Sequence, residues 1–538
     1  MTWDIYDDKM KTKSFCAMNG CAFETNMILL TFELQKHIAQ KSKPGIGDNR
    51  MENQSQKKKP NILLIMTDQM RGDCMGVAGH PDVKTPYLDH LASIGVHYTN
   101  AYTACPSCIP ARCALHTGLK QEHHGRVGYQ DRIPWNYPVT MAGELSKNGY
   151  YTQCVGKMHV HPLRNLMGFH HIELHDGYLH AYRNADVPYG ENQRFADDYF
   201  YWLKTKMGAD RDVTDNGLEC NSFTARPWMY EESLHPTNWV TDRSIDFLRR
   251  RDRSMPFFLM ASYLRPHPPL DAPAHFFDLY RNRELTPPLI GDWADRERLQ
   301  RLGRLTDADT GALDPDLMRQ AQIGYYACIS HLDNQIGRLL DALKDDNSYQ
   351  NTIIIFTSDH GELLGDHHTF RKTRPYQGSI HIPLIIAGAP GMKPGTKCDQ
   401  LAELRDILPT LVELSGSTIP DSIDGLSLLH DNEREYLHGE HSGGELGNQY
   451  IVTKQDKYCW FMESGREQYF RLDTDPNELH DAIGDAEYQD RIAYLRQILI
   501  NELTGREEGY TDGSQLISGR PQRSCLSFLP PFDPIRSR

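Results

Sequence analysis

Short apolar runs that each end in polar residues constrain the fold of this chain most strongly. The first runs from Asn61 to Met66 and is followed by Thr-Asp-Gln, and similar runs cover residues 256–262, 352–358 and 383–388. A continuous apolar run of this length is typical of a strand that is buried on both faces of a parallel sheet. Residues 318–345 instead repeat apolar side chains every three or four positions, which predicts one long helix. The pattern predicts an α/β fold.

The composition excludes several classes of function. The chain has 538 residues, of which 39% are hydrophobic, so it can bury a sizeable core. Its formal net charge of −14 and its pI near 6.0 argue against nucleic acid as a partner. Its 12 cysteines follow no regular framework, which argues against a disulfide scaffold. We find no apolar window long enough for a membrane span and no signal-peptide core, and therefore expect a cytoplasmic protein.

The two ends of the chain differ from its middle. Residues 1–58 are mixed polar and basic, and Met51 resembles an ordinary start just ahead of the first apolar run. We therefore predict that residues 1–58 are an N-terminal extension that is disordered or not native. Beyond about residue 425 the pattern changes to short strands and turns followed by a helix, which predicts a C-terminal subdomain over residues 426–510. Residues 511–538 form a polar, proline-rich tail.

Residues 105–118, which read CPSCIPARCALHTG, predict a site for an anion. Pro110 prevents a regular helix from starting before Cys108, and Gly118 stands where a short helix would end. Cys108 is therefore expected at a helix N-terminus, where free N–H groups and the helix dipole favour a negative ligand. Arg112 lies about one turn further on the same face. A thiol, a helix end and a guanidinium together predict a site for a tetrahedral oxyanion.

The same cysteines allow two other interpretations. Cys105 and Cys108 form a C-x-x-C pair, which occurs in redox proteins and as half of a zinc site. No second C-x-x-C occurs in the chain, which argues against a four-cysteine zinc site. On these residues alone, the redox interpretation stays open.

Further candidate residues follow the predicted strands. Asp68 and Asp359 each come directly after an apolar run, at the strand end where open α/β sheets bind their ligands. Two such carboxylates, with the amide of Gln69 or the imidazole of His360 beside them, could hold Ca²⁺, Mg²⁺ or Mn²⁺. The sequence therefore predicts a site for a divalent cation.

Two basic motifs follow two other predicted strands. Gly156-Lys157-Met-His159 comes after the short strand of residues 149–155, and its lysine and histidine are expected on one side of the extended chain. Pro266 and Pro268 flank His267 after the run 256–262 and hold it in a fixed, extended loop. Both motifs are candidates for contacts with a bound anion.

Together these motifs resemble those of the type I, formylglycine-dependent sulfatases of the alkaline-phosphatase-like superfamily. The resemblance covers residues 58–505 and rests on Cys-x-Pro-Ala-Arg at 108–112 with Thr-Gly at 117–118, Gly-Lys-x-His at 156–159, Pro-His-x-Pro at 266–269, and Lys372 with Tyr-Gln-Gly-Ser at 376–379. It implies a large mixed, mostly parallel central sheet flanked by helices, with a small C-terminal antiparallel sheet and helix. Residues 59–425 would be the catalytic domain.

The resemblance also implies roles for individual residues. In the family, a maturating enzyme oxidises the cysteine to formylglycine, whose hydrated aldehyde is the nucleophile, and Cys108 is the matching residue. The implied cation, Ca²⁺ first with Mg²⁺ or Mn²⁺ as alternatives, would be held by Asp68, Gln69, Cys108, Asp359 and His360. Sulfate would be bound by Lys157, His267 and Lys372. Arg112 and His159 complete the implied catalytic set, with His159 contacting the hydrated aldehyde. Gln69 and Gln377 depart from the acidic residues that are usual in the family.

The implied reaction is the hydrolysis of a sulfate monoester. One hydroxyl of the hydrated aldehyde would attack sulfur, and His267 or Lys372 would protonate the departing alcohol. His159 would then deprotonate the second hydroxyl, which releases sulfate. Aryl, choline and carbohydrate sulfates are not separated by the sequence, and we expect the residues between 163 and about 255 to be substrate-selecting loops.

Two alternatives remain. Phosphonate monoester and phosphodiester hydrolases share the formylglycine motif, although they generally lack the Gly-Lys-x-His pair. A chain in which Cys108 stays unmodified would be a non-catalytic protein that binds sulfated ligands. The sequence leaves open whether the chain forms a homo-oligomer.

Overall fold

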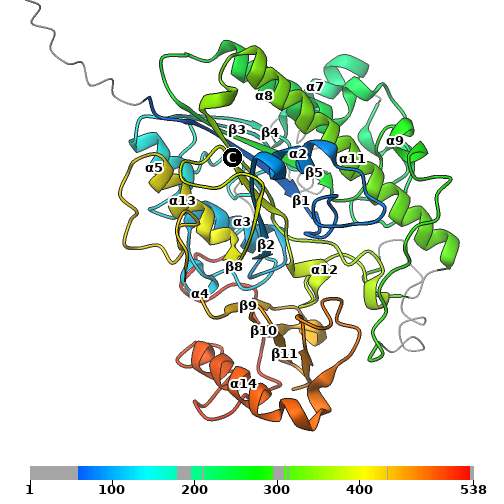
Figure 1. Cartoon of the computed structure of the whole chain (residues 1–538), viewed down its shortest axis with the longest axis vertical. Helices are drawn as coiled ribbons and strands as arrows, with labels where there is room; N and C mark the ends of the chain where they lie inside the picture. The colour runs from blue at the N-terminus through cyan, green and yellow to red at the C-terminus, as the bar shows by residue number, and fades with distance from the viewer. Residues whose placement is uncertain are drawn as a thin grey trace, which may run out of the picture. The chain divides into compact units, whose positions relative to one another are not determined.

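An eight-stranded sheet forms the centre of the unit Lys59–Arg538 (Figure 1). The structure is a computed structural model that describes residues 58–177, 196–208, 211–294, 308–311, 314–432 and 434–532. The strands lie in the order β4-β3-β5-β1-β6-β7-β2-β8. Their bounds are β1 (Asn61–Asp68), β2 (Gly95–Tyr102), β3 (Tyr151–Gly156), β4 (His171–Leu174), β5 (Phe257–Pro266), β6 (Thr352–Ser358), β7 (Leu384–Ala387) and β8 (Thr396–Glu403).

Only one strand of this sheet runs against the others. β7 pairs antiparallel with β6 and β2, whereas the other neighbours pair in parallel. The apolar runs predicted as buried strands form β1, β5, β6 and β7, and β1 lies between β5 and β6 with no exposed residue. The predicted mixed, mostly parallel sheet is confirmed.

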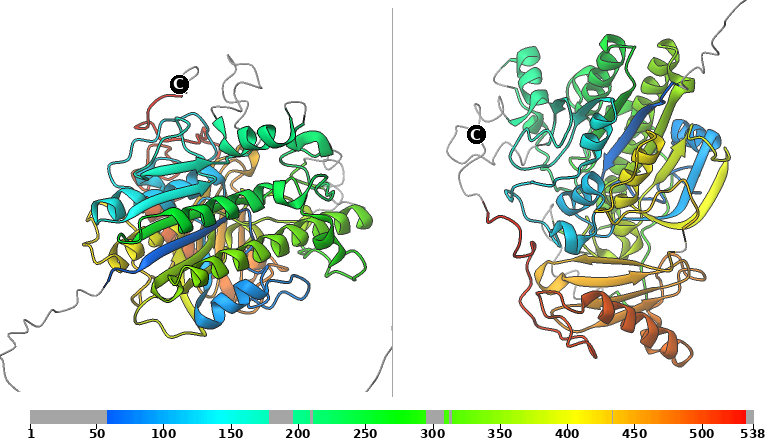
Figure 2. Two further views of the ribbon diagram at one scale, coloured as in Figure 1. Left: turned by 90° about the horizontal axis from the view of Figure 1, so that it is seen from above. Right: turned by 90° about the vertical axis from the view of Figure 1, so that its left-hand side faces the viewer.

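Helices cover both faces of the sheet, as Figure 2 shows. Leu63 and Ile65 of β1 pack with α2 (Pro86–Ile94), α8 (Pro236–Arg250) and α11 (Pro315–Asp345). Ile62, Leu64 and Met66 face the other way and pack with α3 (Cys108–Thr117), α5 (Met141–Lys147) and α13 (Ile407–Leu414). Because neighbouring residues of a strand point to opposite faces, one apolar strand contributes to both cores. Helix α11 confirms the long helix predicted over residues 318–345. Shorter helices are α4 (Gln121–His124), α7 (Asp198–Met207), α9 (Ala274–Asp278) and α12 (Gln377–Ile380).

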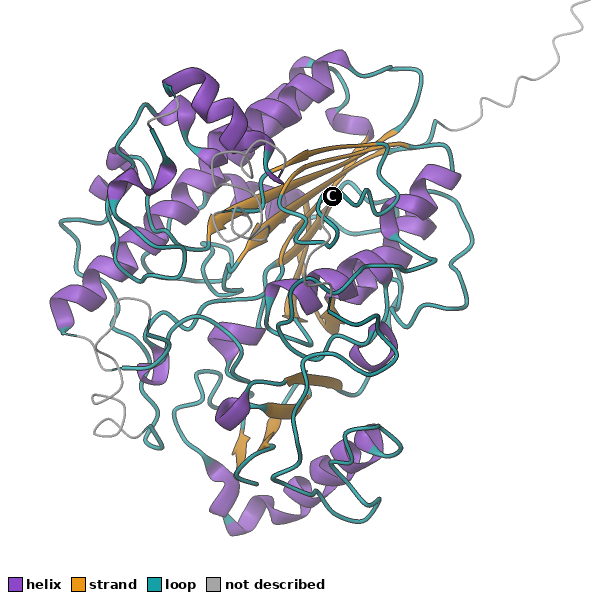
Figure 3. Ribbon diagram, turned by 180° about the vertical axis from the view of Figure 1, so that it is seen from behind, coloured by secondary structure: helices purple, strands orange, loops and turns teal. Residues whose placement is uncertain are grey.

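A second, four-stranded sheet follows near the C-terminus (Figure 3). Its antiparallel strands lie in the order β12-β11-β10-β9, and helix α14 packs on it. Ile492, Leu495 and Leu499 of this helix share one hydrophobic core with Ile451 and Trp460 of the sheet. The bounds are β9 (Leu437–His441), β10 (Asn448–Val452), β11 (Lys457–Phe461), β12 (Glu467–Phe470) and α14 (Gln489–Leu503). The predicted small antiparallel sheet with a helix is confirmed.

Part of the segment between residues 163 and 255 differs from the prediction. It was expected to be loop-rich, but residues 236–250 form helix α8, so the prediction is wrong there. The buried face of α8 includes Asn238, Thr241 and Ser244 beside Trp239 and Leu248, which hides the apolar period in the sequence. Residues 178–195 of this segment, and residues 1–57 of the predicted extension, lie outside the described residues. None of the helices in the described parts of the chain combines the length and apolar character of a membrane span.

Candidate active site

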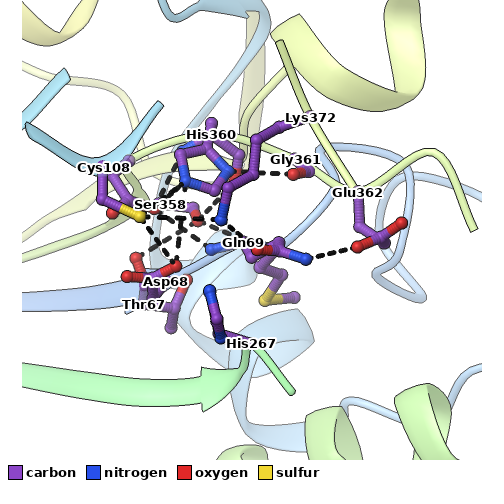
Figure 4. Close-up of polar contacts among 12 residues, drawn as sticks. Thr67, Asp68, Gln69, Cys108, His267, Ser358, His360, Gly361, Glu362 and Lys372 are labelled. Carbon is purple, nitrogen blue, oxygen red and sulfur yellow. Dashed lines mark hydrogen bonds and ion pairs between the residues drawn. The ribbon is translucent and has the colours of Figure 1, made fainter. Parts of the chain in front are cut away.

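Cys108 lies where the ends of two central strands meet the start of helix α3 (Figure 4). Asp68 ends β1 and Asp359 directly follows β6, and the parallel register that pairs Thr67 with Ser358 brings the two carboxylates together. The Cys108 sulfur lies 3.2 Å from Nε2 of His360 and 3.7 Å from Oδ1 of Asp68. Residues from separate parts of the sequence therefore meet at one thiol.

The residues around this thiol fit a divalent cation. Among the described residues, one ligand atom each from Asp68, Cys108, Asp359 and His360 lies within 4.8 Å of the others, and all four residues are buried. Two carboxylates carry the negative charge that a buried cation needs, and their hard oxygen atoms suit Ca²⁺, Mg²⁺ or Mn²⁺. The imidazole can complete the set.

Gln69 stands beside this cluster with its side-chain amide held by two other groups. Its Oε1 accepts a hydrogen bond from Nζ of Lys372 at 2.5 Å, and its Nε2 donates to the carboxylate of Glu362. The backbone N–H of Gln69 donates to Oδ1 of Asp359 at 3.1 Å. The amide oxygen therefore faces the site, and in this arrangement it is the acceptor for Lys372.

Arg112 lies behind the site and does not line it. Its side chain is fully buried, and it donates through Nε to Asp359 at 2.9 Å and through Nη2 to Asp68 at 3.4 Å. Its Nη1 donates to the backbone oxygen of Lys157 at 2.8 Å and to Oγ of Ser262 at 3.0 Å. The sequence predicted a guanidinium that faces an oxyanion, but this one ties both carboxylates to the end of β3 and to Ser262 within β5.

Lys157 and His159 reach the site from the end of β3. Nζ of Lys157 lies 2.6 Å from Oδ2 of Asp68 and 3.9 Å from the Cys108 sulfur. His159 has a left-handed backbone, with φ of 60°, which an L-residue adopts only when its surroundings hold it there. Asp176 does so, because its Oδ1 accepts from the N–H groups of Met158 at 2.8 Å and His159 at 3.0 Å.

His267 and Lys372 line the site from two further loops. Directly after β5, the His267 N–H donates to the backbone oxygen of Asp68 at 3.1 Å, and Nδ1 lies 2.8 Å from the carbonyl of Pro268. Burial lowers the pKa of His267 well below its usual range, and Lys372 lowers it further. Nζ of Lys372 lies 3.6 Å from the Cys108 sulfur. Cys108 therefore has an ammonium group on two sides.

The charges around Cys108 favour an anion at this position. Burial, the largest influence, raises the pKa of the Cys108 thiol, and Asp68 raises it further. The nearby groups of Lys157, Lys372 and His360 outweigh both effects, so the net pKa lies below its ordinary value. A group that carries or develops negative charge is thus stabilised here.

A cavity of about 290 Å³ opens onto the thiol. Of the predicted site residues, Cys108, Lys157, His159, His267 and Lys372 line it, and the cation cluster lies beneath. The sequence did not single out several other lining residues, which come from loops: Tyr129, Asp176, Cys220, Asn221, Asp309, Arg371 and Thr373. No local motif marks these residues, because the folded chain alone brings their loops together. Cys105 and Cys108 are both buried free thiols.

Comparisons with known proteins agree with this fold. A family model described as Sulfatase matches residues 60–417, and a model of the C-terminal part of N-sulphoglucosamine sulphohydrolase matches residues 365–504. An arylsulfatase from Clostridium perfringens is 52% identical over 86% of this chain and 98% of that relative. A choline-sulfatase from Rhizobium meliloti is 30% identical over 78% of this chain and 82% of that relative.

The solved structures point to the same class. The crystal structure of the phosphonate monoester hydrolase of Agrobacterium radiobacter matches with a TM-score of 0.68 at 26% identity, over 82% of this chain and 95% of that one. The fold and the site thus define a hydrolase of the alkaline-phosphatase-like class. Within that class, the chain belongs to the sulfatase family and is a hydrolase of sulfuric ester bonds.

Proposed function

We propose that the chain hydrolyses sulfate monoesters in the cavity above Cys108, after a maturating enzyme has converted this residue to formylglycine. A divalent cation, Ca²⁺ first, would be held by Asp68, Asp359 and His360, with position 108 and the amide of Gln69 beside it. The observation that carries the proposal is the set of contacts around the Cys108 sulfur, which has two ammonium groups, the carboxylate of Asp68 and the imidazole of His360 within hydrogen-bonding range of sulfur.

Formylglycine and the divalent cation would supply two kinds of chemistry. Formylglycine would provide a hydrated aldehyde, of which one hydroxyl can attack sulfur and the other, once deprotonated, can expel the sulfate and restore the aldehyde. The cation would polarise the ester as a Lewis acid. Lys157 and Lys372 would bind the sulfuryl oxygens, because both ammonium groups already lie beside position 108. Arg112 would keep the two carboxylates in register from behind.

Lys372 is a better candidate than His267 for the proton donor to the leaving oxygen. The carbonyl of Pro268 accepts only from a protonated Nδ1, so a neutral His267 presents the bare Nε2 to the cavity. The low pKa of His267 favours this neutral form. The ammonium of Lys372 carries a proton in the same region. His159, which also lines the cavity, would take the proton from the second hydroxyl.

The walls of the cavity support a compact aryl sulfate as the substrate. Leu264, Pro268 and Pro269 form an apolar side, and the ring of Tyr129 stands at its rim. Such a surface suits a flat, apolar leaving group better than a highly hydroxylated one. The 52% identical relative is an arylsulfatase, which supports the same class. We further propose the division into residues 59–425 and 426–510, and a cytoplasmic location.

Phosphonate monoester hydrolysis is the second candidate, because Gln69 and His360 depart from an all-carboxylate site and a phosphonate monoester hydrolase shares the fold. Rates on 4-nitrophenyl sulfate and on a 4-nitrophenyl phosphonate monoester separate the two, with Cys108→Ala as the inactive control. We expect the higher kcat/KM on the sulfate. A higher kcat/KM on the phosphonate would overturn the proposed substrate class.

A further inference from the structure

The C-terminal segment beyond α14 lies outside the residues that either family model matches, which end at residues 417 and 504. The structure describes this segment as far as residue 532. The right-hand view of Figure 2 shows it in red, leaving the small sheet and running along the larger part of the same unit. We call residues 523–529 the C-terminal strap.

The strap pairs with a segment that leads to the cavity. The backbone oxygen of Ser524 accepts from the N–H of Val127 at 3.0 Å, and the N–H of Leu526 donates to the oxygen of Gly125 at 2.8 Å. On its other side, the oxygen of Val127 accepts from the N–H of Ser442, just beyond β9, at 2.8 Å. Residues 125–128 are therefore held between the strap and the small sheet.

Side chains fasten the strap in this place. Glu507 accepts from the N–H of Ser527 at 2.8 Å and pairs with the guanidinium of Arg523 at 2.5 Å. Gly125 has φ of 76°, and a Cβ atom there would lie 2.7 Å from the ring of Phe528. A glycine at position 125 thus permits the close approach of the strap.

The next residue after the braced segment is Tyr129, which lines the cavity. Its side chain is 42% exposed, and its ring meets the His159 ring edge-on, with centroids 6.0 Å apart. We propose that the C-terminal strap is a specificity element that holds Tyr129 over His159 and so shapes the wall that receives the leaving group. This inference rests on the proposed use of the cavity for an aryl leaving group.

The test loosens the strap in the full-length, matured protein. Glu507→Ala removes the acceptor for Ser527 and Arg523, and Arg523→Ala is a milder second variant. Arg520→Ala is the matched control, because Arg520 is exposed and also carries one positive charge in the tail. Hydrogen exchange at the Val127 amide and steady-state kinetics with 4-nitrophenyl sulfate are measured for the parent and all three variants.

In Glu507→Ala we expect faster exchange at Val127 and a KM about tenfold higher, because a cavity wall that is in place about a tenth of the time weakens binding by that factor. Arg523→Ala should change both readouts in the same direction by a smaller factor. kcat should stay within about twofold, since the groups around Cys108 are untouched, and Arg520→Ala should match the parent in both readouts. Unchanged exchange would refute the bracing. Faster exchange with an unchanged KM would refute the role in specificity. Exchange needs no turnover, so a failure of the proposed reaction would be recognised separately.

Discussion

Asp176 offers a sharp test of how the Lys157–His159 loop is held. Oδ1 of Asp176 accepts hydrogen bonds from two N–H groups of this loop, that of Met158 at 2.8 Å and that of His159 at 3.0 Å. Asp176→Leu keeps the branched shape, removes the acceptor and excludes water from its place. Each buried N–H that is left without a partner costs about 1–3 kcal/mol. The left-handed backbone of His159 adds about 1–2 kcal/mol that favours rearrangement of the loop.

The loop should therefore leave its position, and a displacement of about 1 Å at a catalytic group can lower the rate roughly 100-fold. We expect kcat on 4-nitrophenyl sulfate to fall by about that factor in Asp176→Leu. Asp176→Asn retains a carbonyl oxygen that can accept both hydrogen bonds, so its kcat should stay within about tenfold of the parent. Thermal unfolding of both variants controls for general loss of structure. A parental kcat in Asp176→Leu, or equal losses in both variants, would refute the reasoning.

Three further predictions concern charge and metal. Arg112→Met leaves the buried Asp359 carboxylate without its guanidinium partner and leaves Asp68 paired with Lys157. In the presence of a chelator, the free energy of unfolding in urea should therefore fall by about 3–5 kcal/mol, and a loss under about 1 kcal/mol would contradict this. Chelation should abolish sulfate release and added Ca²⁺ should restore it; full activity after exhaustive chelation would argue against the cation site. Burial raises the pKa of Asp333 to about 7. The contribution of the Asp333 carboxyl to the free energy of unfolding is therefore complete below about pH 4 and is lost as the pH rises to 7. Between pH 5 and pH 8, the free energy of unfolding of Asp333→Asn should therefore rise by roughly 2–3 kcal/mol relative to that of the parent. A difference between the two proteins that does not change with pH would contradict the shifted pKa.

The sequence predicted the buried strands well because each of them is a continuous apolar run. β1 and β6 lie in the middle of the sheet and need apolar side chains on both faces. β2 and β8 were not predicted. β8 lies at the edge of the sheet and begins with alternating exposed residues, and β2 lies beside it. An edge strand carries only part of that signal, and tertiary pairing decides its extent.

The sequence likewise predicted some residues of the site and missed others. Asp68, Cys108 and Asp359 follow local elements whose ends the sequence marks, so their meeting could be expected from the topology of a parallel sheet. Tyr129 and Asp176 reach the cavity through contacts with segments that are distant or poorly patterned. Tyr129 depends on pairing with residues near 442 and 524, which no local pattern reveals.

The central claim is that Cys108 is the precursor of the nucleophile, and peptide mass tests it most directly. Trypsin should release residues 85–112, which include both Cys105 and Cys108, from protein matured in a host with a formylglycine-generating activity. Conversion of one thiol to an aldehyde lowers the mass by about 18 Da. We predict this loss in the active protein, with fragment ions that assign it to Cys108. An active protein in which position 108 keeps its thiol would contradict the account.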